Sequence, residues 1–263
     1  MSTRGVARDP RLDGVSIVEI LGVPVARLDP DAALAAITRC YDLAAPALVA
    51  YANAHTLNLA ARDPGYRAVL RRAALVLNDG AGLALAGRLR GRPFPANLNG
   101  SDFTPRVLAL AAARGWPVYF LGARPGVAEE AARRLRARMP DLRVVGVRDG
   151  YFPPEETAAV VEAVRRSRTG LLLVAMGNPR QEFWLDQHLA ATGARVGIGV
   201  GAFFDFAAGV VPRAPAWMNR VGVEWVYRLA HEPRRLWRRY LVGNGVFLAR
   251  VTREALLGIF SRE

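Results

Sequence analysis

Short apolar runs alternate with helical patterns along most of the chain, and this alternation constrains the fold more than any other feature. The apolar runs occupy residues 47–52, 75–77, 117–121, 171–176 and 196–200. Each is followed by Gly, Asn, Asp or Pro and then by a stretch with helical periodicity. Strands that are apolar throughout are typical of a parallel sheet covered on both faces. The sequence therefore predicts a doubly wound α/β fold, with a mostly parallel sheet built from Rossmann-like halves.

Composition divides the chain into three parts. Residues 1–14 are polar and charged without periodicity, so we expect a flexible tail there, without the apolar segment of a secretory signal. Residues 15–211 hold the alternating pattern and predict the α/β domain. In residues 212–263 the strand-like runs stop, and ten arginines stand against four glutamates. This last part predicts a basic, aromatic, helical appendage.

Local signals predict where some elements begin. The stretch Val15–Val25 contains a strand-like run, Val-Ser-Ile-Val-Glu-Ile-Leu. Asp29 followed by a proline predicts the start of a helix. A later helix is expected to begin at Ser101 or Asp102, because both residue types are good N-caps.

The C-terminal part has an amphipathic pattern. One helical stripe collects the apolar residues Leu236, Tyr240, Phe247 and Val251. Such a stripe usually packs on a core, whereas a basic helix with aromatic residues on its other face also suits a membrane surface. Both interpretations stay open on the sequence alone.

Charge points to an anionic partner. The formal net charge is +13, and all 36 basic residues are arginines. Nucleic acid, an acidic membrane or a phosphorylated substrate would each fit, although codon bias explains an arginine-only composition equally well.

Cys40 is the only cysteine, so neither a disulfide nor a cysteine metal site is expected. No apolar run approaches the roughly 20 residues of a spanning helix, and we expect a soluble or peripheral protein.

Two polar residues stand where neighbouring predicted strands end. Asn53 follows one apolar run, and Asp79 follows the next. In open α/β sheets, ligands bind outside the carboxyl ends of the strands. We therefore expect Asp79 to be a catalytic base and Asn53 to orient a substrate. Considered locally, a plain turn in which Asp79 caps the next helix is the more frequent outcome.

Three further strand ends carry candidate binding residues. The turn that starts at Gly122 could cradle a phosphate, although many α/β turns look like it. The loop that starts at Gly177 brings Gln181, which could bind sugar hydroxyls or simply start a helix. Asp205 follows the last predicted strand and could accept from ribose hydroxyls or form an Asx turn.

The C-terminal part also offers a cluster of arginines. Arg228, Arg235 and Arg238 are seven and three residues apart, so on one continuous helix they would lie near one face. Such a face could hold a diphosphate. A solvated basic face is the alternative, and it is favoured without other evidence.

Several motifs in the right order resemble the WecG/TagA/CpsF family of bacterial glycosyltransferases over about residues 15–250. The ordered set, rather than any one motif, carries the resemblance. Its members are Asn53, Asp79-Gly80-x-Gly82, Gly100-Ser101-Asp102, Gly122-x-x-Pro125-Gly126, Gly177-x-Pro179-x-Gln181-Glu182, Gly199-x-Gly201-Ala202-x-x-Asp205, Arg213-Ala214-Pro215, Glu224-Trp225-x-Tyr227-Arg228 and Glu232-Pro233-x-Arg235-x-x-Arg238.

The resemblance implies an inverting, metal-independent enzyme. Such an enzyme moves a sugar, typically N-acetylmannosamine or its uronate, from a UDP-sugar to an undecaprenyl-diphosphate-linked sugar, without a cofactor. It also implies that Asp79 is the base, that Asn53 and Gln181 bind substrate, and that the three arginines meet the lipid diphosphate. An appendage that closes the site at the membrane surface implies a cytoplasmic protein held on the inner face of the membrane.

Two departures from the family pattern affect the donor pocket. Tyr51 replaces the usual threonine, and the loop around Asn97 lacks the usual arginine. Both residues are candidates for contact with the donor sugar. A glucuronosyl or glucosyl donor of exopolysaccharide assembly is therefore an alternative to N-acetylmannosamine.

Two other classes of protein compete with the transferase. A nicotinamide-dependent oxidoreductase needs a dinucleotide fingerprint, but the glycine cluster at 197–202 lies within a predicted strand rather than after one. A basic nucleic-acid-binding protein would fit the charge, but we recognise no RNA or DNA module and expect no such partner. His55, His188 and His231 are scattered without metal-ligand spacing, so no metal is expected. The oligomeric state is open, a homo-oligomer included.

Overall fold

The computed structural model describes residues 14–43, 45–215, 218, 224–231 and 233–260. Within them, eight strands form one sheet in the order β1-β2-β4-β3-β8-β7-β5-β6. All neighbouring strands are parallel except β1 and β2. The strands are β1 (Ile17–Ile20), β2 (Val23–Ala26), β3 (Ala47–Ala52), β4 (Leu75–Asn78), β5 (Val118–Gly122), β6 (Val144–Arg148), β7 (Leu171–Ala175) and β8 (Val196–Gly199).

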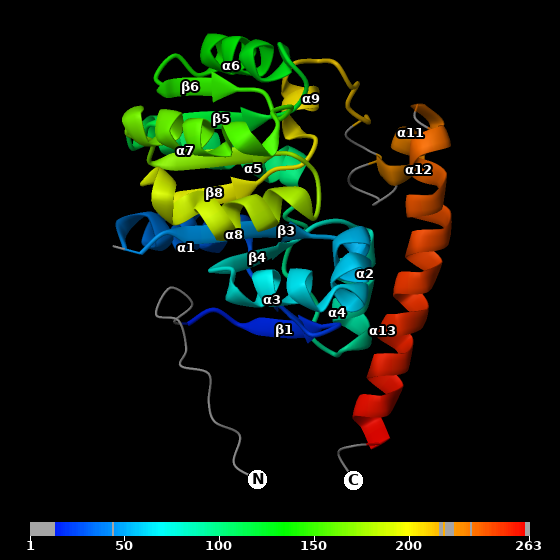
Figure 1. Cartoon of the computed structure of the whole chain (residues 1–263). Helices are drawn as coiled ribbons and strands as arrows, with labels where there is room; N and C mark the ends of the chain where they lie inside the picture. Colours follow the sequence, from blue (N-terminus) through cyan, green and yellow to red (C-terminus); the bar gives the residue numbers. More distant parts are fainter. Residues whose placement is uncertain (1–13, 44, 216–217, 219–223, 232, 261–263) are drawn as a thin grey trace.

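Helices cover both faces of the sheet (Figure 1). The α-helices are α1 (Pro30–Asp42), α2 (Ala54–Arg62), α3 (Pro64–Arg72), α4 (Ala81–Leu89), α5 (Gly100–Ala113), α6 (Val127–Arg138), α7 (Thr157–Arg166), α8 (Arg180–Thr192), α9 (Phe203–Ala207), α11 (Glu224–His231), α12 (Pro233–Trp237) and α13 (Gly243–Phe260). A 3₁₀ turn (Pro154–Glu156) precedes α7, and a π-helical turn (Arg238–Val242) joins α12 to α13.

Two buried clusters lie on opposite faces of the sheet. Side chains of β3 alternate between them: Val49 packs with α1 and α5, whereas Leu48 and Ala50 pack on the side of α2, α3 and α8. Strands buried on both faces cannot show polar alternation, which explains their continuous apolar sequences. The predicted doubly wound, mostly parallel α/β sheet is confirmed.

The strand-like run predicted within residues 15–25 contains β1. It does not reveal that β1 pairs with β2 in an antiparallel hairpin at the edge of the sheet. Leu21 and Gly22 form its two-residue turn, both with positive φ, as the twist of a tight hairpin requires. Because Leu21 is apolar, the turn is concealed in an apolar run.

The helix caps follow the predictions in part. Asp29 caps α1, and its side chain accepts from the Ala32 N–H at 2.8 Å. Neither Ser101 nor Asp102 caps α5; Asn99 does, accepting from the Asp102 N–H at 2.8 Å. Asn, Ser and Asp are all good N-caps, so local preference could not choose among them. Tertiary structure decides, because the Leu98 N–H donates to the Asn78 carbonyl and fixes the chain just before Asn99.

The last helix packs along α2 and α4 (Figure 1). Leu236, Phe247 and Val251 of the predicted stripe are buried, and Tyr240 is half-buried. The Asn58 amide donates to the Gly243 carbonyl at 2.7 Å, and Arg250 donates back to Asn58. The stripe thus packs on the core.

The three-part division of the chain stays a prediction, and residues 1–13 of the predicted tail lie outside the described residues. No described helix has both the length and the apolar character of a membrane span.

Candidate active site

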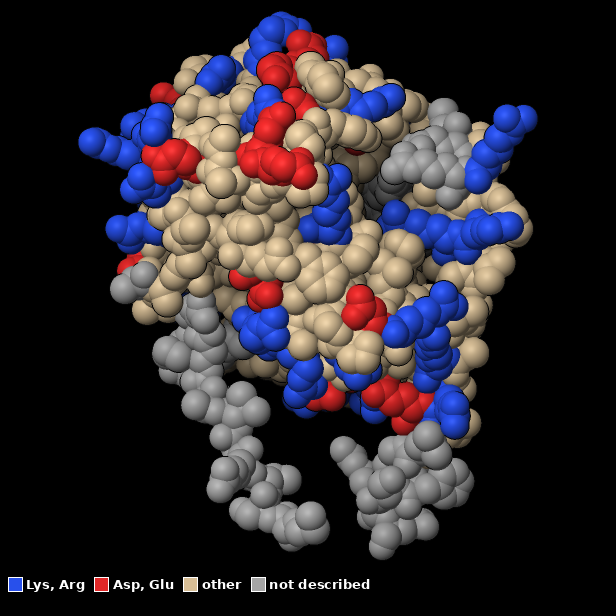
Figure 2. Space-filling view, viewed as in Figure 1, with Lys and Arg blue, Asp and Glu red and all other residues tan. Residues whose placement is uncertain are grey.

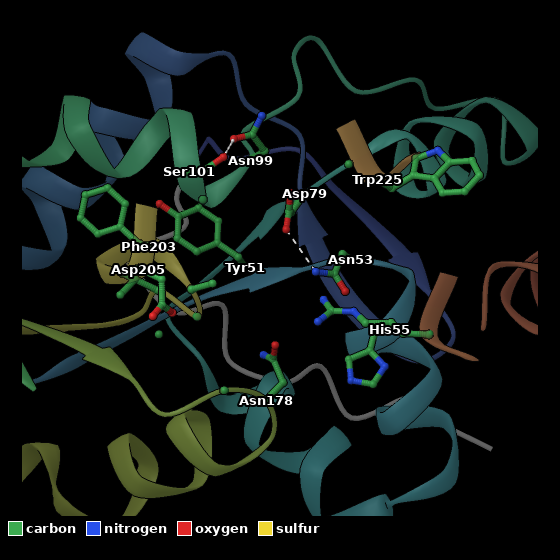
Figure 3. A pocket seen from close by; sticks show the side chains of 18 of the residues that line it. Tyr51, Asn53, His55, Asp79, Asn99, Ser101, Asn178, Phe203, Asp205 and Trp225 are labelled. Atoms are coloured by element: carbon green, nitrogen blue, oxygen red, sulfur yellow. Dashed lines mark hydrogen bonds between the residues drawn. The ribbon is translucent and has the colours of Figure 1, made fainter. Parts of the chain in front are cut away.

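A large cavity opens at the carboxyl edge of the sheet. Its volume is about 1340 Å³, above the roughly 300–1,000 Å³ of most small-molecule sites. The loops after β3, β4, β7 and β8 form one wall, and residues of α11, α12 and α13 form part of the other. Figure 3 shows side chains from both the sheet edge and the C-terminal part facing this space. The space is large enough for two substrates at once.

Asp79 and Asn53 lie side by side in this cavity. The Asn53 Nδ2 atom donates to the Asp79 Oδ2 atom at 3.1 Å (Figure 3). Because β3 and β4 are parallel with Ala52 opposite Asn78, the next residue of each strand falls at the same place. The Asn53 Oδ1 atom caps α2 by accepting from the Thr56 N–H, which fixes the direction of the amide nitrogen. The structure thus brings the predicted base and its predicted partner together.

The alternative in which Asp79 only caps the next helix is wrong. The N-cap of α4 is Gly80, and no side chain makes a capping hydrogen bond there. The Gly80 N–H instead donates to the Asn97 Oδ1 atom at 2.8 Å. Asp79 is half-buried and lines the cavity. Its predicted role as a base stays a prediction.

The two residues that depart from the family pattern both line the cavity. Tyr51 is 6% exposed, and its hydroxyl bonds with that of Thr104 at 3.2 Å. Burial raises the pKa of Tyr51, so its phenol stays protonated and is no rival to Asp79 as a base. Asn97 is held against Gly80, the residue after Asp79, by the bond described above.

Gly122 has a different position from the one predicted. It does not line the cavity; its neighbours Ala123 and Arg124 do. Gly122 has φ +129°, and a side chain there would overlap the backbone of Ala175 on β7. The close approach of two strand ends requires this glycine. A phosphate held by the backbone of the same turn stays a prediction. Gly177 and Asp205 do line the cavity, as predicted.

Gln181 belongs to a buried hydrogen-bond network that the sequence did not reveal. Its Oε1 atom accepts from the Gly201 N–H at 3.1 Å, and its Nε2 atom donates to Glu182 Oε1 at 2.6 Å. The fully buried Glu182 also accepts from Asn178 and from Tyr66. Burial raises the pKa of Glu182 to about 7, although hydrogen bonds from Gln181, Tyr66 and Asn178 oppose the rise. The one sequence feature that pointed to Glu182 was its place in the motif Gly177-x-Pro179-x-Gln181-Glu182.

The predicted arginine cluster is not built on one α-helix. Arg228 lies on α11, Arg235 on α12 and Arg238 on the π-helical turn. The side chains of Arg228 and Arg235 lie outside the described part of the chain. Arg238 is exposed and stacks over the Trp237 ring at 5.2 Å. Its neighbour Arg239, which the sequence analysis missed, lines the cavity.

Arg239 acts electrostatically on His55, a second missed cavity residue. Burial, followed by the charge of Arg239, lowers the pKa of His55 to about 4. His55 is therefore neutral near pH 7 and offers one N–H donor beside a permanent positive charge. The pair suits an anionic group of a substrate. Within the described residues, no group of three or more His, Cys, Asp or Glu side chains could hold a metal ion.

Comparison with known proteins identifies the family of the chain. The family model of the glycosyl transferase WecG/TagA/CpsF family matches residues 18–259. A relative from Bacillus spizizenii (strain ATCC 23059 / NRRL B-14472 / W23) is 34% identical over 182 residues, which cover 69% of this chain and 70% of the relative. A relative from Bacillus subtilis (strain 168) is 29% identical over 195 residues, 74% of this chain and 75% of the relative. Both are named N-acetylglucosaminyldiphosphoundecaprenol N-acetyl-beta-D-mannosaminyltransferase. The chain is a glycosyltransferase and belongs to the WecG/TagA/CpsF family.

Proposed function

We propose that this enzyme transfers an N-acetylmannosamine-type sugar from a UDP-sugar to an undecaprenyl-diphosphate-linked sugar, with inversion and without a metal. The names of the two Bacillus relatives support the acceptor and the sugar. The observation that carries the proposal is the Asp79–Asn53 pair in a cavity large enough for two substrates. A glucuronosyl or glucosyl donor is the alternative, because Tyr51 and Asn97 alter the wall that the donor would meet.

In the proposed reaction Asp79 is the general base. The oxygen of an acceptor hydroxyl forms a bond to the anomeric carbon of the donor sugar. The bond from that carbon to the UDP phosphate oxygen breaks on the opposite side, which inverts the configuration. The hydroxyl proton passes to the Asp79 carboxylate, and the Asn53 amide keeps that carboxylate oriented. Base catalysis of this kind contributes about 10²–10⁴-fold.

The leaving diphosphate gains negative charge and needs stabilisation. We propose that Arg239 and neutral His55 supply it for one substrate diphosphate, together with backbone N–H groups of the loops after β5 and β7. Gln181 and Asp205 would bind hydroxyl groups of the UDP-sugar. Arg228, Arg235 and Arg238 are proposed, by family resemblance, to meet the lipid diphosphate.

We propose that the enzyme works at the inner face of the cytoplasmic membrane as a peripheral protein. The C-terminal part exposes the large apolar side chains Trp237, Leu241 and Val242, which are 43%, 57% and 53% exposed. Arginines lie along the edge formed by α12 and α13 (Figure 2). Apolar groups next to basic groups favour reversible binding to anionic lipid.

Asp79→Asn tests the base directly. The amide keeps the shape of the side chain but cannot take the proton, so we expect UDP release to fall by about 100-fold or more. The assay measures UDP release from a panel of UDP-sugars, with and without a polyprenyl-diphosphate-sugar analogue. Thermal unfolding of the variant is the control for the fold. Release near the wild-type rate would remove Asp79 from the mechanism.

A further inference from the structure

Glu182 lies behind the cavity wall, and three donors from two segments converge on it. Asn178 Nδ2 donates to Glu182 Oε1 at 2.7 Å, and Gln181 Nε2 donates to the same atom at 2.6 Å. The Tyr66 hydroxyl on α3 donates to Glu182 Oε2 at 3.1 Å. The carboxylate is fully buried, so it has no route to a substrate. Any effect of Glu182 on substrate binding must therefore act through the side chains that are hydrogen-bonded to it.

The carboxylate decides which way two side-chain amides point. A carboxylate oxygen only accepts hydrogen bonds, so each amide must turn its nitrogen toward Glu182. A proton on Oε2 would be donated to the Tyr66 oxygen and would leave Oε1 an acceptor. The orientation of Asn178 and Gln181 is therefore the same in both protonation states of Glu182.

This orientation fixes what the amides present to the cavity. Asn178 Nδ2 uses one hydrogen on Glu182 and approaches Tyr66 Oη at 3.3 Å with the other, so Asn178 turns its carbonyl oxygen away from the network. Figure 3 shows the Asn178 amide projecting into the cavity. Gln181 is only 2% exposed, but unlike Glu182 it lines the cavity. Its Oε1 atom is bonded to the Gly201 N–H, and its Nε2 atom keeps one hydrogen beyond the bond to Glu182.

One neutral acceptor beside one neutral donor matches a hydroxyl group, which both donates and accepts. A phosphate has only acceptors at its surface, so the Asn178 carbonyl oxygen would repel it. We propose that Glu182 is a positioning residue that holds Asn178 and Gln181 as a subsite for one sugar hydroxyl. This inference rests on the proposed sugar transfer and adds two residues, Asn178 and Glu182, to it. The hydroxyl belongs either to the donor sugar or to the acceptor sugar.

Three variants separate positioning from simple stability. Glu182→Gln keeps an oxygen for both amides and turns an NH₂ toward the Tyr66 oxygen, so we expect kcat/KM within about threefold of wild type. Glu182→Met removes every acceptor and should raise the KM of one substrate by about five- to tenfold, the value of a hydrogen bond to a hydroxyl. Tyr66→Phe is the matched control, because it removes one bond to Glu182 and the 3.3 Å contact from Asn178 Nδ2, while leaving both amides on Oε1. It should lower the unfolding temperature and leave both KM values alone.

The two KM values identify the source of the hydroxyl. A rise for the UDP-sugar alone assigns it to the donor, and a rise for the polyprenyl-diphosphate-sugar analogue alone assigns it to the acceptor. In either case the inhibition constant of UDP should stay unchanged, because the subsite binds no phosphate. Unchanged KM values in Glu182→Met, or equal rises in Glu182→Met and Tyr66→Phe, would overturn the proposal.

A second test does not depend on the folding of Glu182→Met. Asn178→Ala leaves Glu182 bonded to Tyr66 and Gln181. Wild type should prefer the normal sugar over one of a series of monodeoxy analogues by about five- to tenfold, and Asn178→Ala should lose that preference. Affinities of UDP-sugars measured by calorimetry give the same comparison without turnover. Equal discrimination by both proteins would contradict the subsite, whereas a wild type that transfers no sugar would instead contradict the proposed function.

Discussion

At the scale of single residues, the direction of a side chain decides whether that residue lines the cavity. The sequence placed Asn53 directly after a predicted strand, and in the structure its amide lies against Asp79. Arg238 was predicted and Arg239 was not, yet Arg239 is the one that lines the cavity. Neighbouring helical residues differ in direction by about 100°, and a π-helical turn at these positions shifts that angle again. Sequence spacing could therefore place the arginine-rich segment near the site, but could not choose the residue.

Gly122→Ala is a residue-scale test of why the chain needs a glycine after β5. We expect the free energy of unfolding to fall by about 3 kcal/mol or more, because φ is +129° and the new methyl group would overlap the Ala175 backbone. Gly126→Ala is the control; its φ is +82°, but a methyl group there would meet nothing within 4 Å. Its cost should be about 1–2 kcal/mol. Urea unfolding measures both, and equal costs would show that strand contact is unimportant at Gly122.

At the scale of elements, the interior strands were predictable and the edge was not. Strands such as β3 and β7 are buried on both faces, so an uninterrupted apolar run predicts them from the sequence. The hairpin of β1 and β2 was missed because its turn contains the apolar Leu21. The cap of α5 was missed because Asn99, Ser101 and Asp102 are all suitable by type. Both errors arise where tertiary contacts, rather than local preference, choose the boundary.

Val251→Ala tests how α13 is held on the α/β sheet domain. Val251 is fully buried against the cluster that includes α2, and it does not line the cavity. Removing two methyl groups should lower the free energy of unfolding by about 2 kcal/mol. Leu256→Ala is the matched control, because Leu256 is on the same helix and 53% exposed; its change should stay within about 0.5 kcal/mol. If both variants lose the same stability in urea, α13 is not anchored through Val251.

At the scale of the whole molecule, arginines have different surroundings in different regions. On the α/β domain, arginines of α6 and α7 form ion pairs with Glu130 and Glu162 of the same helices. The C-terminal part instead combines the exposed Arg234 and Arg238 with exposed apolar side chains. Anionic lipid is therefore expected to meet the molecule at α12 and the start of α13.

Trp237→Ser combined with Leu241→Ser tests that surface without touching the cavity wall. We expect co-sedimentation with anionic liposomes to weaken by about tenfold, because apolar area that would enter the lipid is lost. Binding of the wild type should also fall as salt rises, since charge contributes to it.

Leu43→Ser is the control, as Leu43 is an exposed leucine outside the C-terminal part. Deleting α12 and α13 would be a poorer test, because Leu236 and Phe247 line the cavity. Unchanged sedimentation of the double variant would place the lipid contact elsewhere.

The bond from Asn58 to the Gly243 carbonyl joins positions 185 residues apart, and Phe247 lines a cavity that also contains Asn53. A ribosome therefore makes Asn53 and Asp79 long before it makes the opposite wall of the cavity. The nascent chain can shape the sheet edge, but the cavity is lined on its other side only after α13 has been made. A chain that stops before α13 would therefore leave the cavity open on the side that Phe247 and Leu248 line.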